Sequence, residues 1–270
     1  MRLEVRGVSA GYGAKLVLDG VEFEIPAGKI MTLVGANGSG KSTLLKVIGR
    51  LLKPRTGCVL LDGKAVHSCD TAELARKMAI LPQLHHASGE TTVRELVGFG
   101  RFPYRSGFGV LSARDREVIA EILRLTRLEP LQERKLSTLS GGERQRAWIA
   151  MTLAQEPGVL LLDEPTTFLD IRCQFEVIEL VRDLNRRCGI TVLMVLHDLN
   201  LAARCSDFIV TLKGRRIRHI GTPREILQPE ILREIFEIES VVHVGADDIP
   251  YCVPTGSVKE EDNKNGDGGL

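Results

Sequence analysis

The sequence predicts an α/β fold in which helices cover a largely parallel β-sheet. Two observations lead to this prediction: short apolar runs rich in Val, Ile and Leu recur along the chain, and amphipathic segments of helical period separate them. Hydrophobic residues make up 43% and charged residues 26% of the 270 residues, the usual mixture for a globular protein. The predicted buried strands are residues 30–34, 59–61, 159–162, 191–196 and 208–212, and the predicted helices are residues 42–51, 172–187 and 199–205.

The N-terminal part has a different pattern. Residues 3–8 and 21–25 alternate between apolar and polar side chains, and the Gly-rich run Gly11-Tyr12-Gly13 lies between them. Alternation of this kind is typical of strands with one solvated face, so we expect an antiparallel β layer here.

A helical subdomain is predicted between residues 91 and 156, where strand patterns disappear. Ser112 begins one amphipathic segment there, which runs to about Leu128. We expect this subdomain to be inserted into a single domain of residues 1–242. The remaining residues, 243–270, form a C-terminal extension, and its Gly, Asp, Glu, Asn and Lys content predicts disorder from about residue 255.

The charge balance argues against some classes of function. Lys and Arg number 36 and Asp and Glu 35, so the formal charge of +1 provides no attraction to nucleic acid or to anionic lipid. The first residues carry no secretion signal, and charged residues interrupt every apolar run before it reaches the ~20 residues of a membrane span. The six cysteines form no C-x-x-C pair and are expected to be reduced. We therefore expect a cytosolic chain whose role at a membrane depends on a partner.

A phosphate-binding loop is predicted directly after the strand at residues 30–34. Residues 35–42 read Gly-Ala-Asn-Gly-Ser-Gly-Lys-Ser and match G-x-x-x-x-G-K-[ST] between a strand and a helix. The glycines allow successive N–H groups and the helix N-terminus to turn toward an anion. Lys41 can then reach the β- and γ-phosphates of a nucleotide, and the Ser42 hydroxyl can ligate Mg²⁺. The alternative is a Gly-rich turn with a solvated lysine, although all four specified positions match the motif.

Two adjacent carboxylates follow the predicted strand at residues 159–162. Asp163 is placed to hold Mg²⁺, directly or through water, and Glu164 is then free to act as general base on an attacking water. A solvated acidic turn before Pro165 is the alternative interpretation, and it would be favoured if no phosphate loop preceded it.

Two further polar side chains follow predicted strands. His197 comes directly after residues 191–196, at the sheet edge where α/β proteins bind ligands, and it could donate a hydrogen bond to a γ-phosphate. Taken alone, it could also be a structural hydrogen bonder. Gln83, which follows the strand-like residues 78–81, is equally ambiguous alone.

A second anion-binding helix start is predicted at residues 139–146, which read Leu-Ser-Gly-Gly-Glu-Arg-Gln-Arg. One nucleotide site does not need two such starts from one chain. A head-to-tail dimer does, because this helix would cap the γ-phosphate held by the other subunit. With this motif the sequence resembles the ATP-binding subunits of ABC transporters, and LSGGE resembles their signature motif.

The resemblance covers residues 3 to about 242, with the motifs in the family's order. It implies a P-loop NTPase (RecA-like) core with an N-terminal antiparallel β layer and an α-helical ABC-specific subdomain. It also implies that Tyr12 stacks on adenine, that Gln83 contacts Mg²⁺ or water, and that His197 is the switch histidine. Catalysis would fall to Glu164, His197 and Gln83, and Mg²⁺ binding to Ser42, Gln83 and Asp163. The other residues that the resemblance assigns to nucleotide binding are Gly35, Asn37, Gly38, Ser39, Gly40, Lys41, Thr43, Ser140, Gly141, Gly142 and the D-loop residue Asp170.

The sequence departs from the family pattern at two positions. Glu143 stands where many members have Gln, which leaves Ser140 and Gly142 intact. Phe168 precedes Leu-Asp where a small residue is common, which leaves the intersubunit geometry of the D-loop open.

A narrower resemblance points to the importer ATPases for iron-siderophore, haem and cobalamin uptake. It rests on residues 92–97, on Gly-Arg-Phe-Pro-Tyr at residues 100–104, on residues 195–202 and on Gly-Thr-Pro at residues 221–223. An iron chelate is the preferred cargo, with cobalamin and haem as alternatives. The segment at residues 100–103 could also be a turn with a solvated Arg101.

The resemblance implies ATP and Mg²⁺ as cofactors. Its implied partners are a second copy of the chain, a polytopic membrane permease and, indirectly, an extracytoplasmic substrate-binding protein. The chain would lie peripherally on the cytoplasmic face of the cell membrane. A soluble ABC-type ATPase of translation or DNA repair is the rival from another class, but the sequence has one nucleotide-binding unit and no basic surplus for nucleic acid. An exporter ATPase would share every catalytic motif and differ in its partner.

Overall fold

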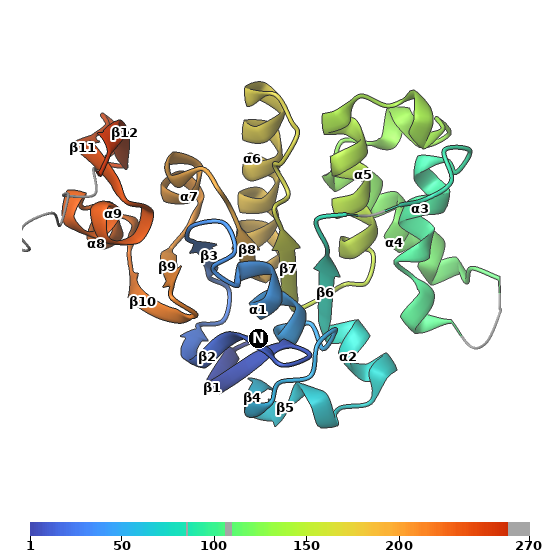
Figure 1. Ribbon diagram of the computed structural model, residues 1–270. Coiled ribbons are helices and arrows are strands. Elements are labelled where there is room, and N and C mark those ends of the chain that lie inside the picture. Colours follow the sequence, from blue (N-terminus) through green and yellow to red (C-terminus); the bar gives the residue numbers. More distant parts are fainter. Residues whose placement is uncertain (85, 106–109, 259–270) are drawn as a thin grey trace, which may run out of the picture.

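The computed structural model describes residues 1–84, 86–105 and 110–258, and in it two β-sheets lie on either side of helix α1 (Lys41–Ile48) (Figure 1). The smaller sheet is antiparallel and contains four strands within the described residues. In spatial order they are β2 (Lys15–Ile25), β1 (Leu3–Tyr12), β4 (Thr56–Leu61) and β5 (Lys64–Ala65). This sheet is the antiparallel layer that the alternating N-terminal pattern predicts.

The strand at residues 59–61 was wrongly predicted to join the parallel sheet. It is part of β4, which pairs antiparallel with β1 through Leu61 opposite Leu3 and Val59 opposite Val5. An apolar run of three residues shows that a strand is buried, but it carries no information about which neighbour its backbone contacts.

The larger sheet is mostly parallel and has six strands within the same described ranges. Alternate side chains of its central strands enter two separate cores: Val159 and Leu161 pack toward α1, whereas Leu160 and Leu162 pack toward the opposite side. In spatial order the strands are β10 (Arg216–Gly221, antiparallel), β9 (Phe208–Lys213), β3 (Ile30–Val34), β8 (Thr191–Val195), β7 (Val159–Asp163) and β6 (Met78–Leu81).

The register of the parallel strands lines up their carboxyl ends. Leu33 and Asp163 both pair with Val195, and Leu81 pairs with Leu162. The segments that follow these strands therefore leave the sheet at one edge, where ligands bind in open α/β sheets. Helices α6 (Ile171–Cys188) and α7 (Leu199–Cys205) cover the face opposite α1.

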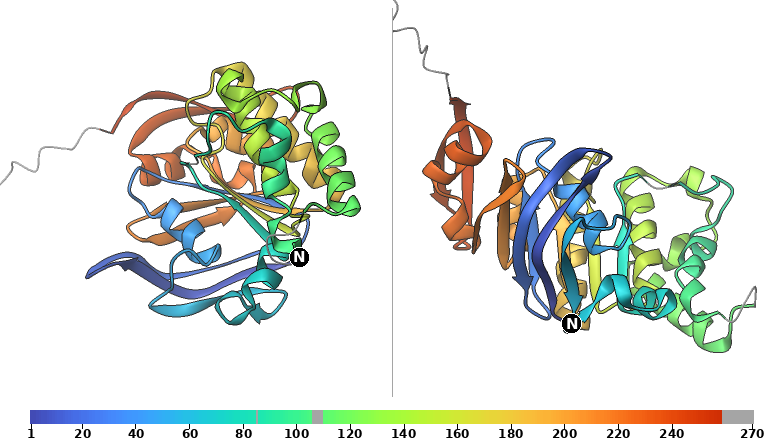
Figure 2. Two further views of the ribbon diagram at one scale, coloured as in Figure 1. Left: turned by 90° about the vertical axis from the view of Figure 1, so that its right-hand side faces the viewer. Right: turned by 60° about the horizontal axis from the view of Figure 1, so that its bottom comes forward.

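The helices of the predicted subdomain gather beside β6 at one end of the molecule (Figures 1 and 2). Each begins at a capping box, in which a hydroxyl and a carboxylate exchange hydrogen bonds with backbone N–H groups. These helices are α3 (Val93–Phe99), α4 (Ala113–Leu125) and α5 (Gly141–Leu153). Another helix, α2 (Thr71–Lys77), precedes β6. Short 3₁₀ turns span Val66–Ser68, Phe102–Tyr104, Glu129–Leu131 and Leu136–Thr138.

Arg101 is buried inside this subdomain, so the interpretation of residues 100–103 as a turn with a solvated arginine is wrong. Its side chain is 2% exposed and lies over the ring of Tyr104, with 3.9 Å from Cζ to the ring centroid. Its guanidinium donates to Asp115 at 2.8 Å, to the Ala154 carbonyl at 2.7 Å and to Glu156 at 2.7 Å. The arginine thus ties the end of α3 to the start of α4 and the end of α5.

Residue 242, the predicted end of the ATPase domain, lies within an ordered strand near the C-terminal end of the described residues. Helices α8 (Pro223–Ile226) and α9 (Pro229–Phe236) lead into a hairpin of β11 (Ile238–Val244) and β12 (Pro250–Ser257). Disorder predicted from residue 255 is wrong for the last residues of β12, because pairing with β11 orders that polar segment. The rest of the predicted disorder, residues 259–270, lies outside the described residues. Of the helices described, none has the length and apolar character to cross a bilayer.

Candidate functional site

The loop between β3 and α1 requires glycine at two positions. Gly35 has a φ angle of 152° and Gly40 one of 109°, backbone conformations that other residues rarely adopt. A Cβ atom at Gly35 would lie 2.3 Å from the carbonyl oxygen of Leu212, and one at Gly40 would lie 2.8 Å from Cδ2 of Leu18. The loop therefore passes close to its neighbours and directs the N-terminus of α1 toward the adjacent cavity.

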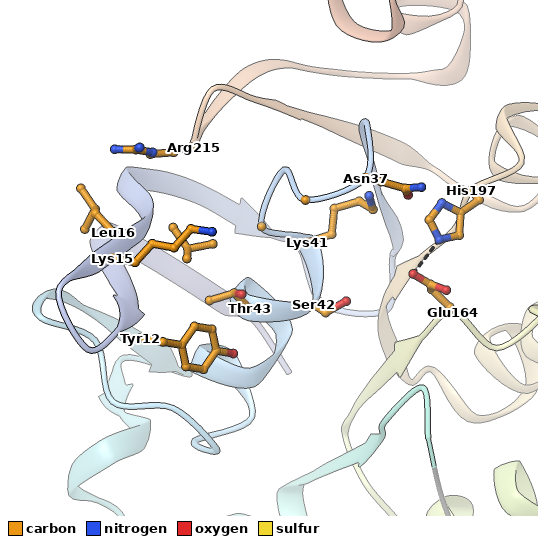
Figure 3. Close-up of a pocket in the computed structure, with 13 residues that line it drawn as sticks. Tyr12, Lys15, Leu16, Asn37, Lys41, Ser42, Thr43, Glu164, His197 and Arg215 are labelled. Carbon is orange, nitrogen blue, oxygen red and sulfur yellow. Dashed lines mark ion pairs between the residues drawn. The ribbon is translucent and has the colours of Figure 1, made fainter.

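This cavity has a volume of about 370 Å³, within the range of small-molecule sites. Figure 3 shows two ends, with Tyr12 and Arg215 at one and Glu164 and His197 at the other. Tyr12 comes from the last position of β1 and is half-exposed. The cavity wall between the two ends is formed by Asn37, Gly38, Gly40, Lys41, Ser42 and Thr43.

Lys41 is a buried cation beside the cavity. Its side chain donates to the carbonyl oxygens of Gly35 at 2.8 Å and Ala36 at 3.1 Å, both within its own loop. Burial lowers the pKa of Lys41, and the nearby charges of Glu164 and Asp163 oppose that shift. An ammonium group held in this way is poorly solvated, so an incoming phosphate would be a favourable partner for it.

Ser42 and Asp163 supply oxygen ligands of the type that Mg²⁺ prefers. The Ser42 hydroxyl donates to Oδ1 of Asp163 at 2.9 Å, and burial raises the pKa of Asp163 although this hydrogen bond opposes the rise. In the part of the chain that the structure describes, no cluster of three or more His, Cys, Asp or Glu side chains could hold a metal. Mg²⁺ would therefore need phosphate oxygens and water in addition, which is its usual mode of binding.

Glu164 is the meeting point of the predicted catalytic residues. Its Oε1 lies 2.6 Å from Nε2 of His197 (Figure 3), and its Oε2 accepts from Nε2 of Gln83 at 2.6 Å and from the Thr167 hydroxyl at 3.0 Å. The strand register explains the meeting, because these residues follow three neighbouring strands. Glu164 also has a φ angle of +53°, and positive φ at a residue with a side chain is often found at functional sites.

The structure does not bring the signature residues to this cavity. Ser140 is the N-cap of α5, where its hydroxyl accepts from the N–H of Glu143 at 3.3 Å. Among the described residues that line the cavity there is none from residues 140–142. Gly141 instead lines a second hollow, between the helical subdomain and Gln83. Asp170 is likewise apart from the cavity and caps α6, accepting from the N–H of Cys173 at 2.9 Å.

Several residues of the site have no sequence motif. Lys15, Leu16, Val17 and Arg215 line the cavity beside Tyr12. Arg215 reaches it because the turn between β9 and β10 contacts β2, where the N–H of Asp19 donates to the Arg215 carbonyl at 2.9 Å. The presence of Arg215 at the cavity follows only from this tertiary contact between the β9–β10 hairpin and β2. Thr167, in contrast, lies three residues after Glu164, and its hydroxyl could have been suspected from that spacing.

Comparisons with known proteins identify relatives along nearly the whole chain. The family described as ABC transporter matches residues 18–167. The iron(3+)-hydroxamate import ATP-binding protein FhuC of Bacillus subtilis is 44% identical over 260 residues, covering 96% of this chain and 97% of FhuC. The ferric enterobactin transport ATP-binding protein FepC of Escherichia coli is 40% identical over 259 residues, covering 94% of each chain.

Solved structures resemble this one closely. A structure described as an inward-facing ABC transporter of the metal-chelate type matches with a TM-score of 0.81 at 26% identity, covering 93% of this chain and 96% of that one. A dimeric bacterial ABC transporter cassette matches with a TM-score of 0.71 at 32% identity, covering 82% of this chain and 99% of that one.

Proposed function

The chain belongs to the ABC transporter family, and from this premise we propose that it is the ATP-hydrolysing subunit of an importer that takes up ferric siderophores. The observation that carries the enzymatic part is the convergence of Gln83 and His197 on Glu164, at one end of a cavity walled by Lys41 and Ser42. The cargo is supported by relatives whose names state iron-hydroxamate, achromobactin and ferric enterobactin transport.

ATP binds with its base beside Tyr12 and its phosphates along the N-terminus of α1. Lys41 turns from its loop carbonyls to the β- and γ-phosphates, where it neutralises charge. Ser42, Asp163 and Gln83 would hold Mg²⁺, which when bound supplies positive charge against the phosphate oxygens. Glu164 orients the attacking water and accepts its proton, and His197 stabilises charge on the γ-phosphate.

A second copy of the chain completes each site. The signature residues Ser140 and Gly142 lie away from the nucleotide cavity of their own chain, and α5 presents a helix N-terminus that favours a phosphate. In a head-to-tail dimer they contact the nucleotide of the partner, and Asp170 lies between the subunits. The dimeric cassette among the similar structures supports this arrangement. Hydrolysis then reopens the dimer, and this movement drives the permease.

The importer needs further components besides the ATPase subunit. Transport requires a polytopic membrane permease, and an extracytoplasmic binding protein would deliver the cargo to it. The ATPase subunit lies peripherally on the cytoplasmic face of the membrane and does not touch the cargo. Nucleic acid is not a partner, because the formal charge of +1 provides no surplus for its backbone.

The test is uptake in cells that carry either the native chain or Glu164→Gln at matched protein levels. Labelled ferric siderophore, cobalamin and haem are supplied in parallel, and Glu179→Gln, an exposed carboxylate on α6, serves as the control. The proposal is supported if Glu164→Gln loses uptake of ferric siderophore but not of cobalamin or haem, while Glu179→Gln keeps all three. Selective loss of cobalamin or haem uptake would keep the mechanism and change the cargo, and unchanged uptake of all three would contradict the import role.

A further inference from the structure

We propose that Asn200 is a positioning residue for His197, because it fastens the C-terminal hairpin of β11 and β12 to the first turn of α7. This inference rests on the proposed role of His197 in ATP hydrolysis. It assigns a function to a hairpin that contributes nothing to the lining of the nucleotide cavity within the described residues.

Asn200 holds the hairpin at two points. Its Oδ1 accepts from the backbone N–H of Cys252 at 2.8 Å, and its Nδ2 donates to the carbonyl of the same residue at 3.1 Å. The side-chain amide thus pairs with one residue of β12 along the edge that faces away from β11, as a neighbouring strand would. Cys252 is only 4% exposed, so water is a poor substitute partner for its N–H and carbonyl groups.

The same residue is tied to the segment that carries His197. Asp198 is the N-cap of α7, and its Oδ1 accepts from the N–H groups of Asn200 at 2.8 Å and Leu201 at 2.9 Å. Strand β8 ends at Val195, so His197 lies on a short connection with the sheet at one end and the capped turn at the other. A shift of this turn would move the imidazole relative to Glu164, from which it is 2.6 Å away.

The hairpin also packs against the core beside α7, where Cys252 is buried in the same cluster as Leu201 and Ala202. Next to this contact lies a cavity of about 370 Å³, with Phe175 from α6 and Tyr251 from β12 in its lining. One turn beyond Asn200, Arg204 spans this space: its Nη2 lies 3.2 Å from Oδ2 of Asp247, and its guanidinium lies over the ring of Phe175. This ion pair is about half exposed and contributes little on its own. The Asn200 side chain is exposed as well, but both of its hydrogen bonds end on the backbone of the buried Cys252.

The experiment measures ATP hydrolysis by the purified full chain carrying Asn200→Ala. We expect kcat to fall between about tenfold and a hundredfold, with KM for ATP changed less than about twofold, because the displaced group acts in the reaction rather than in binding. Asn200→Asp keeps the acceptor for the Cys252 N–H and should lose less activity; it replaces Asn200→Ala if that variant does not fold. Val253→Ala is the matched control, since this exposed side chain is the next one along β12.

A double-variant cycle separates positioning from a general loss of structure. If Asn200 acts through His197, adding Asn200→Ala to His197→Ala should not slow hydrolysis further. Equal losses with and without His197, or a native kcat for Asn200→Ala, would overturn the inference while leaving the proposed function intact. A native kcat for His197→Ala would instead remove the proposed role of His197 and, with it, the basis of the inference.

Discussion

Nε2 of His197 lies 2.6 Å from Oε1 of Glu164, so the residues that follow two adjacent parallel strands are in direct contact. The contact is set by the sheet, because Val195 of β8 and Asp163 of β7 are register partners. Gln83 holds the other carboxylate oxygen. Glu164 is therefore oriented from both sides, as a group that must position a water molecule requires.

Replacing Glu164 by Gln should separate hydrolysis from binding. The amide is nearly the same size but cannot accept a proton from water, so the rate of phosphate release should fall at least about a hundredfold. ATP affinity should change little, because Lys41 and the loop remain. Phosphate release and binding of a fluorescent ATP analogue measure the two quantities. Glu179→Gln, on the exposed side of α6, is the control, and wild-type turnover of Glu164→Gln would exclude the general-base role.

Replacing Lys41 by Ala should weaken ATP binding. The loop would keep its glycine-dependent path, but the buried positive charge beside the cavity would be lost. Affinity should fall by at least about tenfold, the loss that follows when one charge-assisted contact is removed. Calorimetric titration with ATP measures it. Lys53→Ala removes an exposed lysine and should bind as the native chain does; equal affinities of the two variants would contradict a phosphate contact by Lys41.

The two signature glycines should differ in their tolerance of a methyl group. A Cβ atom at Gly142 would lie 2.6 Å from Sγ of Cys173, whereas one at Gly141 would meet only Cδ2 of Leu169, at 3.4 Å. Gly142→Ala should therefore destabilise the fold by about 1–3 kcal/mol through overpacking. Gly141→Ala should stay within about 0.5 kcal/mol of the native chain. Chemical denaturation measures both.

If the steric conflict at Gly142 is with Cys173, shortening the Cys173 side chain should relieve it. In a Cys173→Ala background the close sulfur is absent, so Gly142→Ala should destabilise the fold less than it does in the native background. An unchanged difference between the two backgrounds would show that the conflict lies elsewhere.

Removing Arg101 should cost more stability than removing a surface arginine. The Arg101→Met variant leaves the buried carboxylate of Asp115 without its ion-pair partner, and breaking a buried pair in this way costs about 3–5 kcal/mol. Arg124→Met, which removes an exposed arginine from α4, is the control. A loss as small as that of the control would contradict a central role for Arg101 in the subdomain.

Asp115 should also make stability depend on acid pH. Burial acts to raise its pKa, but hydrogen bonds from Ser112 and Arg101 outweigh burial and lower the pKa from 3.8 to about 2. The folded chain thus holds this proton less tightly than the unfolded chain does. The contribution is complete above about pH 4 and is lost as the pH falls through about 2. In Arg101→Met the pKa of Asp115 should lie nearer its ordinary value, so the acid-dependent loss should be smaller and should end at a higher pH, as denaturation at several pH values would show.

The motifs that act through contiguous residues could be predicted from the sequence. Residues 35–42 form their loop by local backbone geometry, and the glycines that this loop needs can be identified directly in the sequence. Asp163 and Glu164 follow a strand whose burial is evident from four apolar residues. The α/β class followed from the same kind of signal, because apolar period and length are local properties of a segment.

Tertiary structure decided everything that depends on a partner distant in the sequence. Strand pairing placed β4 in the antiparallel sheet and gave order to the polar residues of β12, because backbone hydrogen bonds do not depend on which side chains are present. From the sequence alone Arg101 could be a surface residue, and only the folded chain surrounds it with three acceptors from other segments. Arg215 reaches the cavity only because two hairpins touch. Local sequence therefore determined the chemistry of the site, and long-range contacts determined which groups meet there.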